Sequence, residues 1–96
     1  MKKIKKTADT VGGRLYMAIK ASGSSVQNAA ELCSVTDHTM YRYIWNEISP
    51  KIDCVITICK HADVDIEWIA TGEIKQGTKY ASYVESKNEY VLMQKE

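Results

Sequence analysis

Five polar or charged side chains in one short segment are this chain's best candidates for reading another molecule through hydrogen bonds. They are Asp37, His38, Thr39, Tyr41 and Arg42. The apolar residues of the same segment recur at helical spacing, so the five are expected on the outer side of a helix that begins at position 37. Arginine can bond guanine through O6 and N7, aspartate can accept from cytosine N4, and threonine or tyrosine can contact a thymine methyl group. The segment therefore predicts a surface that reads base edges in a groove of DNA.

Catalytic or metal-binding chemistry has weaker support in the sequence. The nearest candidate cluster is Cys54, Cys59 and His61. On one helix Cys54 and His61 share a face, but Cys59 lies about 140° from Cys54, and no fourth ligand follows at zinc spacing. His38 lacks the surrounding carboxylates that would indicate a pocket. We therefore expect no enzyme activity, no metal and no cofactor, and we expect all three cysteines, Cys33 included, to be free thiols without disulfides.

The element before the polar segment predicts how that segment is positioned. Between positions 26 and 33, apolar residues are spaced at i, i+3, i+4 and i+7, as on one face of a helix. Ser34 and Val35 interrupt this spacing, and the Thr36 hydroxyl can accept from a free backbone N–H of the next helix. Two short helices joined by a tight turn are therefore expected, and the second helix carries the polar side chains.

Two longer helices are expected to flank this pair. The first runs from about position 10 to 22 and ends at Gly23, although glycines at positions 12 and 13 could delay its start to Arg14. The other is expected after the pair, with Ser49 as its cap and Pro50 as its first residue. Its expected buried stripe is Ile52, Val55, Ile56 and Cys59.

A fifth, short helix completes the expected domain. Asp65 is its expected cap, residues 66–70 form its body, and Gly72 ends it. Five helices with short loops predict a compact all-α domain over residues 10–73. Residues 74–96 are expected to form a short C-terminal extension. Within it, residues 79–84 and 90–93 are rich in tyrosine and valine and favour a β-hairpin, while near-helical spacing leaves one helix as the alternative.

Length and charge place limits on the class of protein. Ninety-six residues with 45% hydrophobic and 26% charged residues fit one globular domain with a single modest core. No apolar run is long enough to span a bilayer or to act as a signal peptide, so a cytoplasmic location without a membrane partner is expected. The net charge is only +1, but the first nine residues form a basic arm suited to a phosphate backbone. Its lysines are Lys2, Lys3, Lys5 and Lys6.

The segment from Arg14 to Glu73 resembles the helix-turn-helix domains of phage repressors in the lambda-repressor-like superfamily. Among these it resembles the N-terminal domain of temperate-phage CI repressors. The resemblance rests on Ala30, Val35, Met40, Tyr43 and, above all, the sequence IEWIATGE at positions 66–73. Two positions differ from the usual family pattern, because Ser34 and Asn46 stand where glycine is common. A left-handed serine is less favourable than glycine by about 1 to 2 kcal/mol, whereas asparagine tolerates this geometry.

The resemblance implies a sequence-specific transcriptional regulator, a phage or prophage repressor that occupies a double-stranded DNA operator as a homodimer. It implies that the five polar residues of the second short helix face the major groove. It implies no small-molecule substrate, and it places three residues at the start of the first short helix against DNA phosphates, where free N–H groups also lie. These three are Ser25, Gln27 and Asn28.

Two features leave room for other partners. Leu32 and Trp45 are apolar at usually polar positions, so the chain could instead be a protein-interaction module such as an antitoxin, an antirepressor or an excision cofactor. The extension at residues 74–96 carries more apolar surface than an isolated hairpin can support in water. We therefore expect it to be the dimerisation element, in which a second copy pairs edge strands with it and buries both aromatic faces symmetrically.

Overall fold

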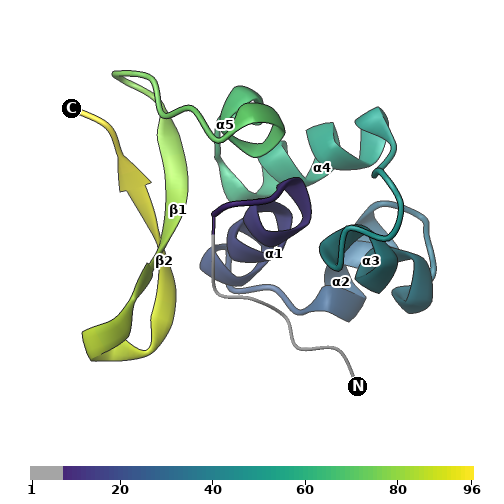
Figure 1. The fold of residues 1–96 in the computed structure, drawn as a ribbon. Helices are drawn as coiled ribbons and strands as arrows, with labels where there is room; N and C mark the ends of the chain where they lie inside the picture. The colour runs from purple at the N-terminus through teal and green to yellow at the C-terminus, as the bar shows by residue number, and fades with distance from the viewer. Residues whose placement is uncertain (1–7) are drawn as a thin grey trace.

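The computed structural model describes residues 8–96, so the lysines predicted to contact DNA from the arm lie outside the described residues. Five helices precede two strands along the chain (Figure 1). The elements are α1 (Val11–Ala21), α2 (Val26–Leu32), α3 (Asp37–Ile44), α4 (Ile52–Ala62), α5 (Ile66–Thr71), β1 (Lys79–Val84), the 3-10 turn η1 (Glu85–Lys87) and β2 (Glu89–Gln94). Within residues 8–96, no helix is both long and apolar enough to cross a membrane.

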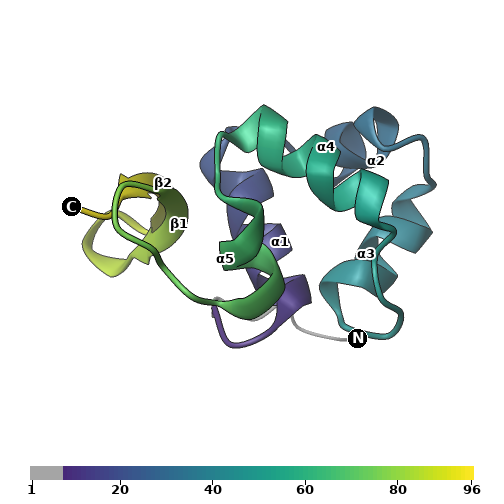
Figure 2. The ribbon, with the colours of Figure 1, turned by 90° about the horizontal axis from the view of Figure 1, so that it is seen from above.

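Helix α1 is the centre of the molecule, with the other helices on one side and the hairpin on the other (Figures 1 and 2). It begins at Val11, because the Thr10 side chain accepts a hydrogen bond from the Gly13 N–H at 3.0 Å. The two glycines therefore do not delay the helix. Its buried Leu15 and Ile19 join Met40 of α3 and Trp68 of α5 in one core.

The prediction of an all-α fold is wrong, because the C-terminal segment forms a two-stranded antiparallel sheet and the fold is mixed α/β. Strand β1 pairs with β2 in a register that places Lys79 opposite Gln94 and Val84 opposite Glu89. The alternative of a single C-terminal helix is also excluded. Tyrosine and valine suit the half-buried, pleated surface that this hairpin provides.

The hairpin completes the core instead of lying beside a finished helical domain. Ala81 of β1 is 1% exposed, and the rings of Tyr16 in α1 and Tyr90 in β2 meet edge to face at 5.7 Å. Trp68 and Tyr80 bring α5 against β1, with ring centroids 6.2 Å apart. Five helices were expected to account for the whole core, but one side of α1 and the Trp68 ring need the hairpin as cover.

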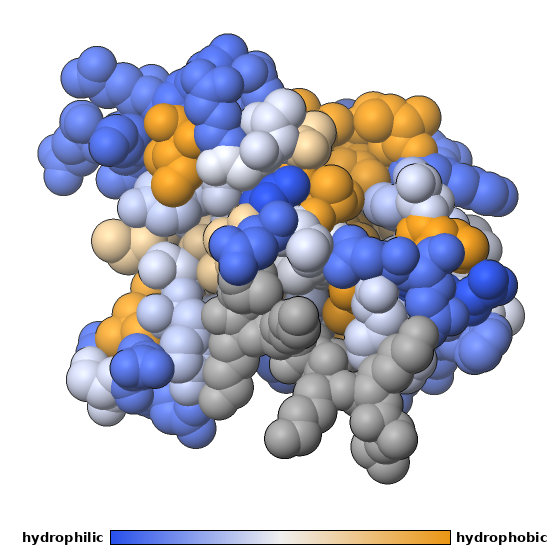
Figure 3. Space-filling view, viewed as in Figure 1, coloured by the Kyte–Doolittle hydropathy of each residue, from blue (hydrophilic) through white to orange (hydrophobic). Residues whose placement is uncertain are grey.

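Helix α4 differs from its predicted form in both start and orientation. It begins at Ile52, after Lys51 as N-cap, so Ser49 and Pro50 lie outside it. Ile52 and Ile56 were expected to be buried, but Ile52 is 68% exposed and Ile56 is exposed too. Figure 3 shows that apolar side chains gather on the surface in the region of α4. The residues that α4 buries are Cys54, Val55, Ile58, Cys59 and Ala62. Because α4 carries apolar residues on several sides, its sequence allowed either stripe.

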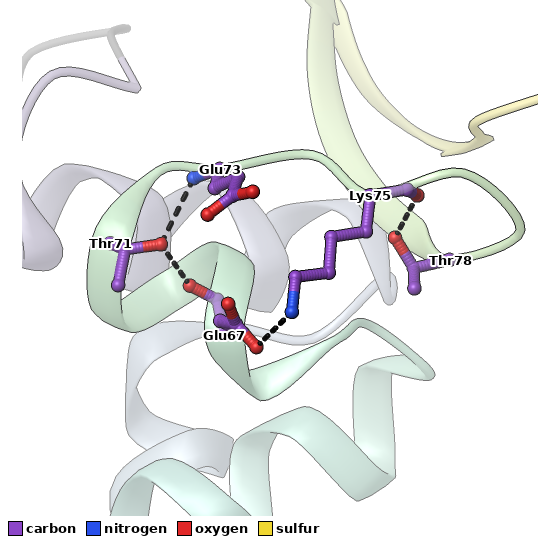
Figure 4. A network of polar contacts seen from close by, with 5 residues as sticks. All are labelled: Glu67, Thr71, Glu73, Lys75 and Thr78. Atoms are coloured by element: carbon purple, nitrogen blue, oxygen red, sulfur yellow. Dashed lines mark hydrogen bonds and ion pairs between the residues drawn. The ribbon is translucent and has the colours of Figure 1, made fainter.

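The link from α5 to the hairpin is held by polar contacts (Figure 4). Gly72 ends α5 in a left-handed conformation, as predicted. The Thr71 hydroxyl donates to the Glu67 carbonyl at 2.8 Å, and the Lys75 ammonium lies 2.8 Å from the Glu67 carboxylate. This hydrogen-bonded carboxylate raises the pKa of Lys75. At the other end of the link, the Asp65 N–H donates to the Lys79 carbonyl at 2.8 Å.

Candidate nucleic-acid interface

The turn between α2 and α3 keeps the left-handed geometry that glycine usually provides, although serine is unfavourable there. Ser34 has φ of 56°, and the Val35 N–H reaches back to the Ala30 carbonyl at 3.0 Å, as in a Schellman C-cap. Val35 is half-buried against the core. The next helix then begins at once, because the Thr36 hydroxyl accepts from the Thr39 N–H at 3.1 Å. The two-helix arrangement expected from the sequence is therefore present, with serine in the position that usually favours glycine.

Helix α3 presents the five predicted reading residues to the surface and buries the opposite side. Met40, Tyr43 and Ile44 are buried. Asp37 and His38 are exposed at the first turn of α3. The other three are half-buried: Thr39, Tyr41 and Arg42. Since all five lie on one accessible strip of α3, the structure brings together what the helical spacing predicted.

Three contacts orient the side chains on this strip. The Thr36 hydroxyl donates to the Thr39 hydroxyl at 3.1 Å, which leaves Thr39 able to donate outward. The Tyr41 ring packs against Trp45 with centroids 5.3 Å apart. The Arg42 Nε lies 3.6 Å from a Glu47 carboxylate oxygen. Glu47 therefore restrains the arginine best suited to bond a guanine, a role that sequence reasoning missed because Glu47 lies beyond the end of α3.

The C-terminal end of α3 is fastened to the start of α1. Asn46 is left-handed, with φ of 61°, and its amide oxygen accepts from the Gly12 N–H at 2.9 Å. Its amide nitrogen donates to the Thr10 hydroxyl at 3.0 Å. A Cβ at Gly12 would lie 2.3 Å from the Ile44 carbonyl oxygen, so only glycine permits this approach. Asn46 thus does more than tolerate the turn geometry, because its side chain joins α1 to α3.

The predicted phosphate contacts lie at the start of α2. The Ser25 hydroxyl accepts from the Asn28 N–H at 3.1 Å and keeps its own proton for another acceptor. Gln27 and Asn28 are exposed. The Ser24 hydroxyl lies 2.9 Å from Nε2 of His61, at the end of α4. Sequence reasoning did not place His61 here, because the two residues are 37 positions apart.

Arg14 does not add to the accessible basic charge. Its side chain is buried, with Nε donating to the Ile69 carbonyl at 2.8 Å and Nη1 donating to the Ala8 carbonyl at 2.6 Å. Burial lowers the pKa of Arg14, and the charge of Asp9 opposes this shift by raising it. The guanidinium nevertheless remains protonated, as it does in proteins generally. Arg14 is therefore a structural residue that ties the end of α5 to the segment before α1.

The cysteines and His61 do not gather into one group. Cys54 and Cys59 are buried and Cys33 is half-buried, all as free thiols. Burial raises the pKa of Cys59 to about 11 and that of Cys54 still further, so both thiols are neutral at pH 7. The Cys33 Sγ lies 3.6 Å from the Cys54 carbonyl oxygen, and His61 lies by Ser24. Within residues 8–96, no three histidine, cysteine or acidic side chains are grouped as metal ligands.

Leu32 and Trp45, the two apolar residues at usually polar positions, have different environments. Trp45 is half-buried and packs against both the core and Tyr41, whereas Leu32 is 45% exposed at the end of α2.

Comparisons of the chain with protein-family models, with curated proteins and with solved structures gave no match.

Proposed function

We propose that this protein is a sequence-specific DNA-binding regulator of transcription, a cytoplasmic phage or prophage repressor that acts by occupying an operator. The observation that carries the proposal is the accessible strip of α3, which combines five hydrogen-bonding side chains with an opposite side that is buried in the core. An α-helix fits the major groove, where these side-chain types can distinguish base pairs. Occupation of a promoter needs no chemistry, so the proposal assigns no catalytic residue.

The anchoring of α3 supports this reading. Both ends of the helix are fixed, by the Thr36 cap and by the bonds of Asn46 to Thr10 and Gly12. A reading helix benefits from such fixed ends, because base contacts require side chains held in register with the groove. Ser25, Gln27 and Asn28 would contact phosphate beside α3, and the lysines of the arm would follow the backbone. Phosphate contacts of this kind position a protein, whereas base contacts specify the sequence.

The proposal is tested by selection of duplexes from a random-sequence library with the full chain, followed by titration of a selected duplex and of an unrelated one. Convergence on a twofold sequence is expected. Arg42→Ala should weaken binding to the selected duplex by about 1 to 3 kcal/mol and change binding to the unrelated duplex little. Lys87→Ala, at the exposed hairpin turn, is the matched control and should leave both affinities unchanged. Failure to converge, or equal losses on both duplexes, would remove the base-reading role.

A second candidate function is a protein-interaction module on the same fold. The observation that favours it is the exposure of three isoleucines, Ile52, Ile56 and Ile66, because exposed apolar side chains that are grouped together mark interaction sites. Ile66 lines two hollows of about 420 and 470 Å³, and Ile52 lines the first and Ile56 the second. The same titration separates the two functions. A module of this kind would retain no duplex even at low salt, where phosphate contacts are strongest.

A further inference from the structure

The outer edge of β2 offers unused backbone groups in a regular array. In an antiparallel pair, bonded and non-bonded residue pairs alternate along the ladder. The Lys95 N–H donates to the Thr78 carbonyl at 2.9 Å, so Lys95 and Thr78 form a bonded pair at the end of the ladder. Every second residue of β2 counted back from Lys95 is therefore bonded to β1, and the N–H and C=O groups of the three residues between them point away from β1. These residues are Tyr90, Leu92 and Gln94. Among the described residues, no backbone hydrogen bond joins these three to another element.

The side chains along this edge are apolar and accessible. Leu92 is 40% exposed and Met93 is 41% exposed, and half-buried Val91 precedes them. In the upper part of the hairpin, which holds the C-terminal half of β2, β1 lies between β2 and the helices, so the outer edge of that half faces away from the helices (Figure 1). Natural proteins usually protect such an edge with lysine, proline or a bulge within the strand. Strand β2 has none of these between Glu89 and Gln94.

We propose that two copies of this chain associate through their β2 strands, antiparallel about a twofold axis at Leu92, to form a continuous four-stranded sheet. Only a twofold register centred on Leu92 brings all the outward-facing residues into bonded pairs. Tyr90 then pairs with Gln94 of the partner subunit, and Leu92 pairs with the partner's Leu92, with two hydrogen bonds for each pair. The proposal goes beyond the proposed function, because self-association is present or absent whatever the chain binds.

Charge complementarity identifies the occupant as a second copy. In this register Glu89 lies opposite the partner's Lys95, and symmetry repeats the contact at the other end of the paired strands. Opposite charges that face each other across strands stabilise a sheet, and like charges destabilise it. Both residues are exposed, and neither has an ion-pair partner in the described part of the chain. The same register places Val91 opposite the partner's Met93, which removes exposed apolar surface from water.

The sequence suggested that a second copy pairs edge strands with the extension and also covers the aromatic faces of both copies. Only the edge pairing is retained in the proposal. The aromatic face is already covered within the chain, since Tyr90 packs on Tyr16 and Tyr80 packs near Trp68. The edge of β2 is what remains available. Pairing of edges needs no rearrangement of the domain, because the backbone groups already point outward.

The test is charge reversal, read by sedimentation equilibrium of the full chain from low micromolar to near-millimolar concentration. Glu89→Lys alone, and Lys95→Glu alone, each place like charges opposite each other at both ends of the pairing. Each should raise the dimer dissociation constant by about tenfold or more. The double reversal restores opposite charges and should return the constant to near its original value. Recovery of this kind cannot come from a general loss of folding.

Matched controls carry the same change of net charge outside the pairing. Glu85→Lys and Lys87→Glu lie in the turn η1 and should leave the dissociation constant unchanged. The proposal is overturned if the unaltered chain is monomeric throughout, if the single reversals have no effect, or if the double reversal fails to recover association. A dimer that is lost with Ile52→Asp but survives the β2 reversals would place the interface on α4 and also overturn it.

Discussion

At the scale of single residues, Gly12 and Asn46 show how α1 comes close to the end of α3. Gly12 has no side chain to obstruct the contact, and the Asn46 side chain accepts a hydrogen bond from the Gly12 N–H. Glycine has a low helix propensity, but only glycine at position 12 allows α1 to pack on the end of α3. Sequence reasoning treated Gly12 as a weak point, since the partner segment lies 34 positions away along the chain.

Gly12→Ala should therefore destabilise the fold by about 1 to 3 kcal/mol, as overpacking of a filled site does. The added Cβ would lie within 2.4 Å of two carbonyl oxygens of α3, which are backbone atoms and cannot turn aside. Urea denaturation measures the change. Lys20→Ala, at an exposed position of the same helix, serves as control and should stay within about 0.5 kcal/mol. An unaltered midpoint for Gly12→Ala would show that α1 and α3 are further apart.

Tyr90 gives the molecule an alkaline pH dependence. Desolvation by burial raises the pKa of this phenol from 10.0 to about 12. Between these values the unfolded chain loses the phenolic proton while the folded chain keeps it, so stability falls as pH rises from 10 to 12. Tyr90→Phe should flatten this part of the profile, measured as the urea midpoint against pH. Equal slopes for both proteins would show that the Tyr90 hydroxyl is solvated.

At the scale of elements, α5 has only six residues and depends on its neighbours. The Trp68 ring, 1% exposed, packs near Tyr80 of the hairpin, and Arg14 holds the Ile69 carbonyl. The limits of α5 could be predicted from Asp65 and Gly72, because the preferences for these residues at helix ends are local, although the Asp65 side chain makes no capping hydrogen bond. The contact between α5 and the hairpin could not be predicted, because the way in which these two segments meet depends on the whole fold.

Trp68→Ala should cost about 3 to 5 kcal/mol, in line with the removal of a large buried aromatic ring. Thermal unfolding followed by circular dichroism measures the loss. Trp45→Ala is the comparison, since that ring is half-buried and should cost clearly less. Similar losses for the two variants would move Trp45 into the core and weaken any role for it on the surface.

At the scale of the whole molecule, the positions of most helices were predictable, but the start of α4 and the fold class were not. Periodicity and capping residues are local signals, and they predicted α2, α3 and α5 together with the polar side of α3. The buried side of α4 and the place of the hairpin depend on which apolar surfaces α1 leaves open. Ala81 shows the difference, because nothing in its own segment marks this small residue as part of the core.

Truncation after Glu73 should therefore lower the stability of the remaining helices by several kcal/mol, because the exposed sides of α1 and Trp68 lose their cover. The full chain and the fragment are compared by urea denaturation with circular dichroism. A fragment with the midpoint of the full chain would show that the hairpin is an appendage, as the sequence suggested.

The central position of α1 has a mechanical consequence. The helix contacts the end of α3 through Gly12 and the hairpin through Tyr16, which lie about one helical turn apart, so a single turn of α1 joins the predicted reading residues of α3 to the hairpin that carries the proposed twofold edge. A continuous helical turn of this kind contains no hinge. One base pair inserted between two half-sites turns one of them by about 34° about the DNA axis, a rotation that a hingeless dimer cannot follow. The rigid connection through α1 would thus restrict the proposed operator to one spacing of its half-sites.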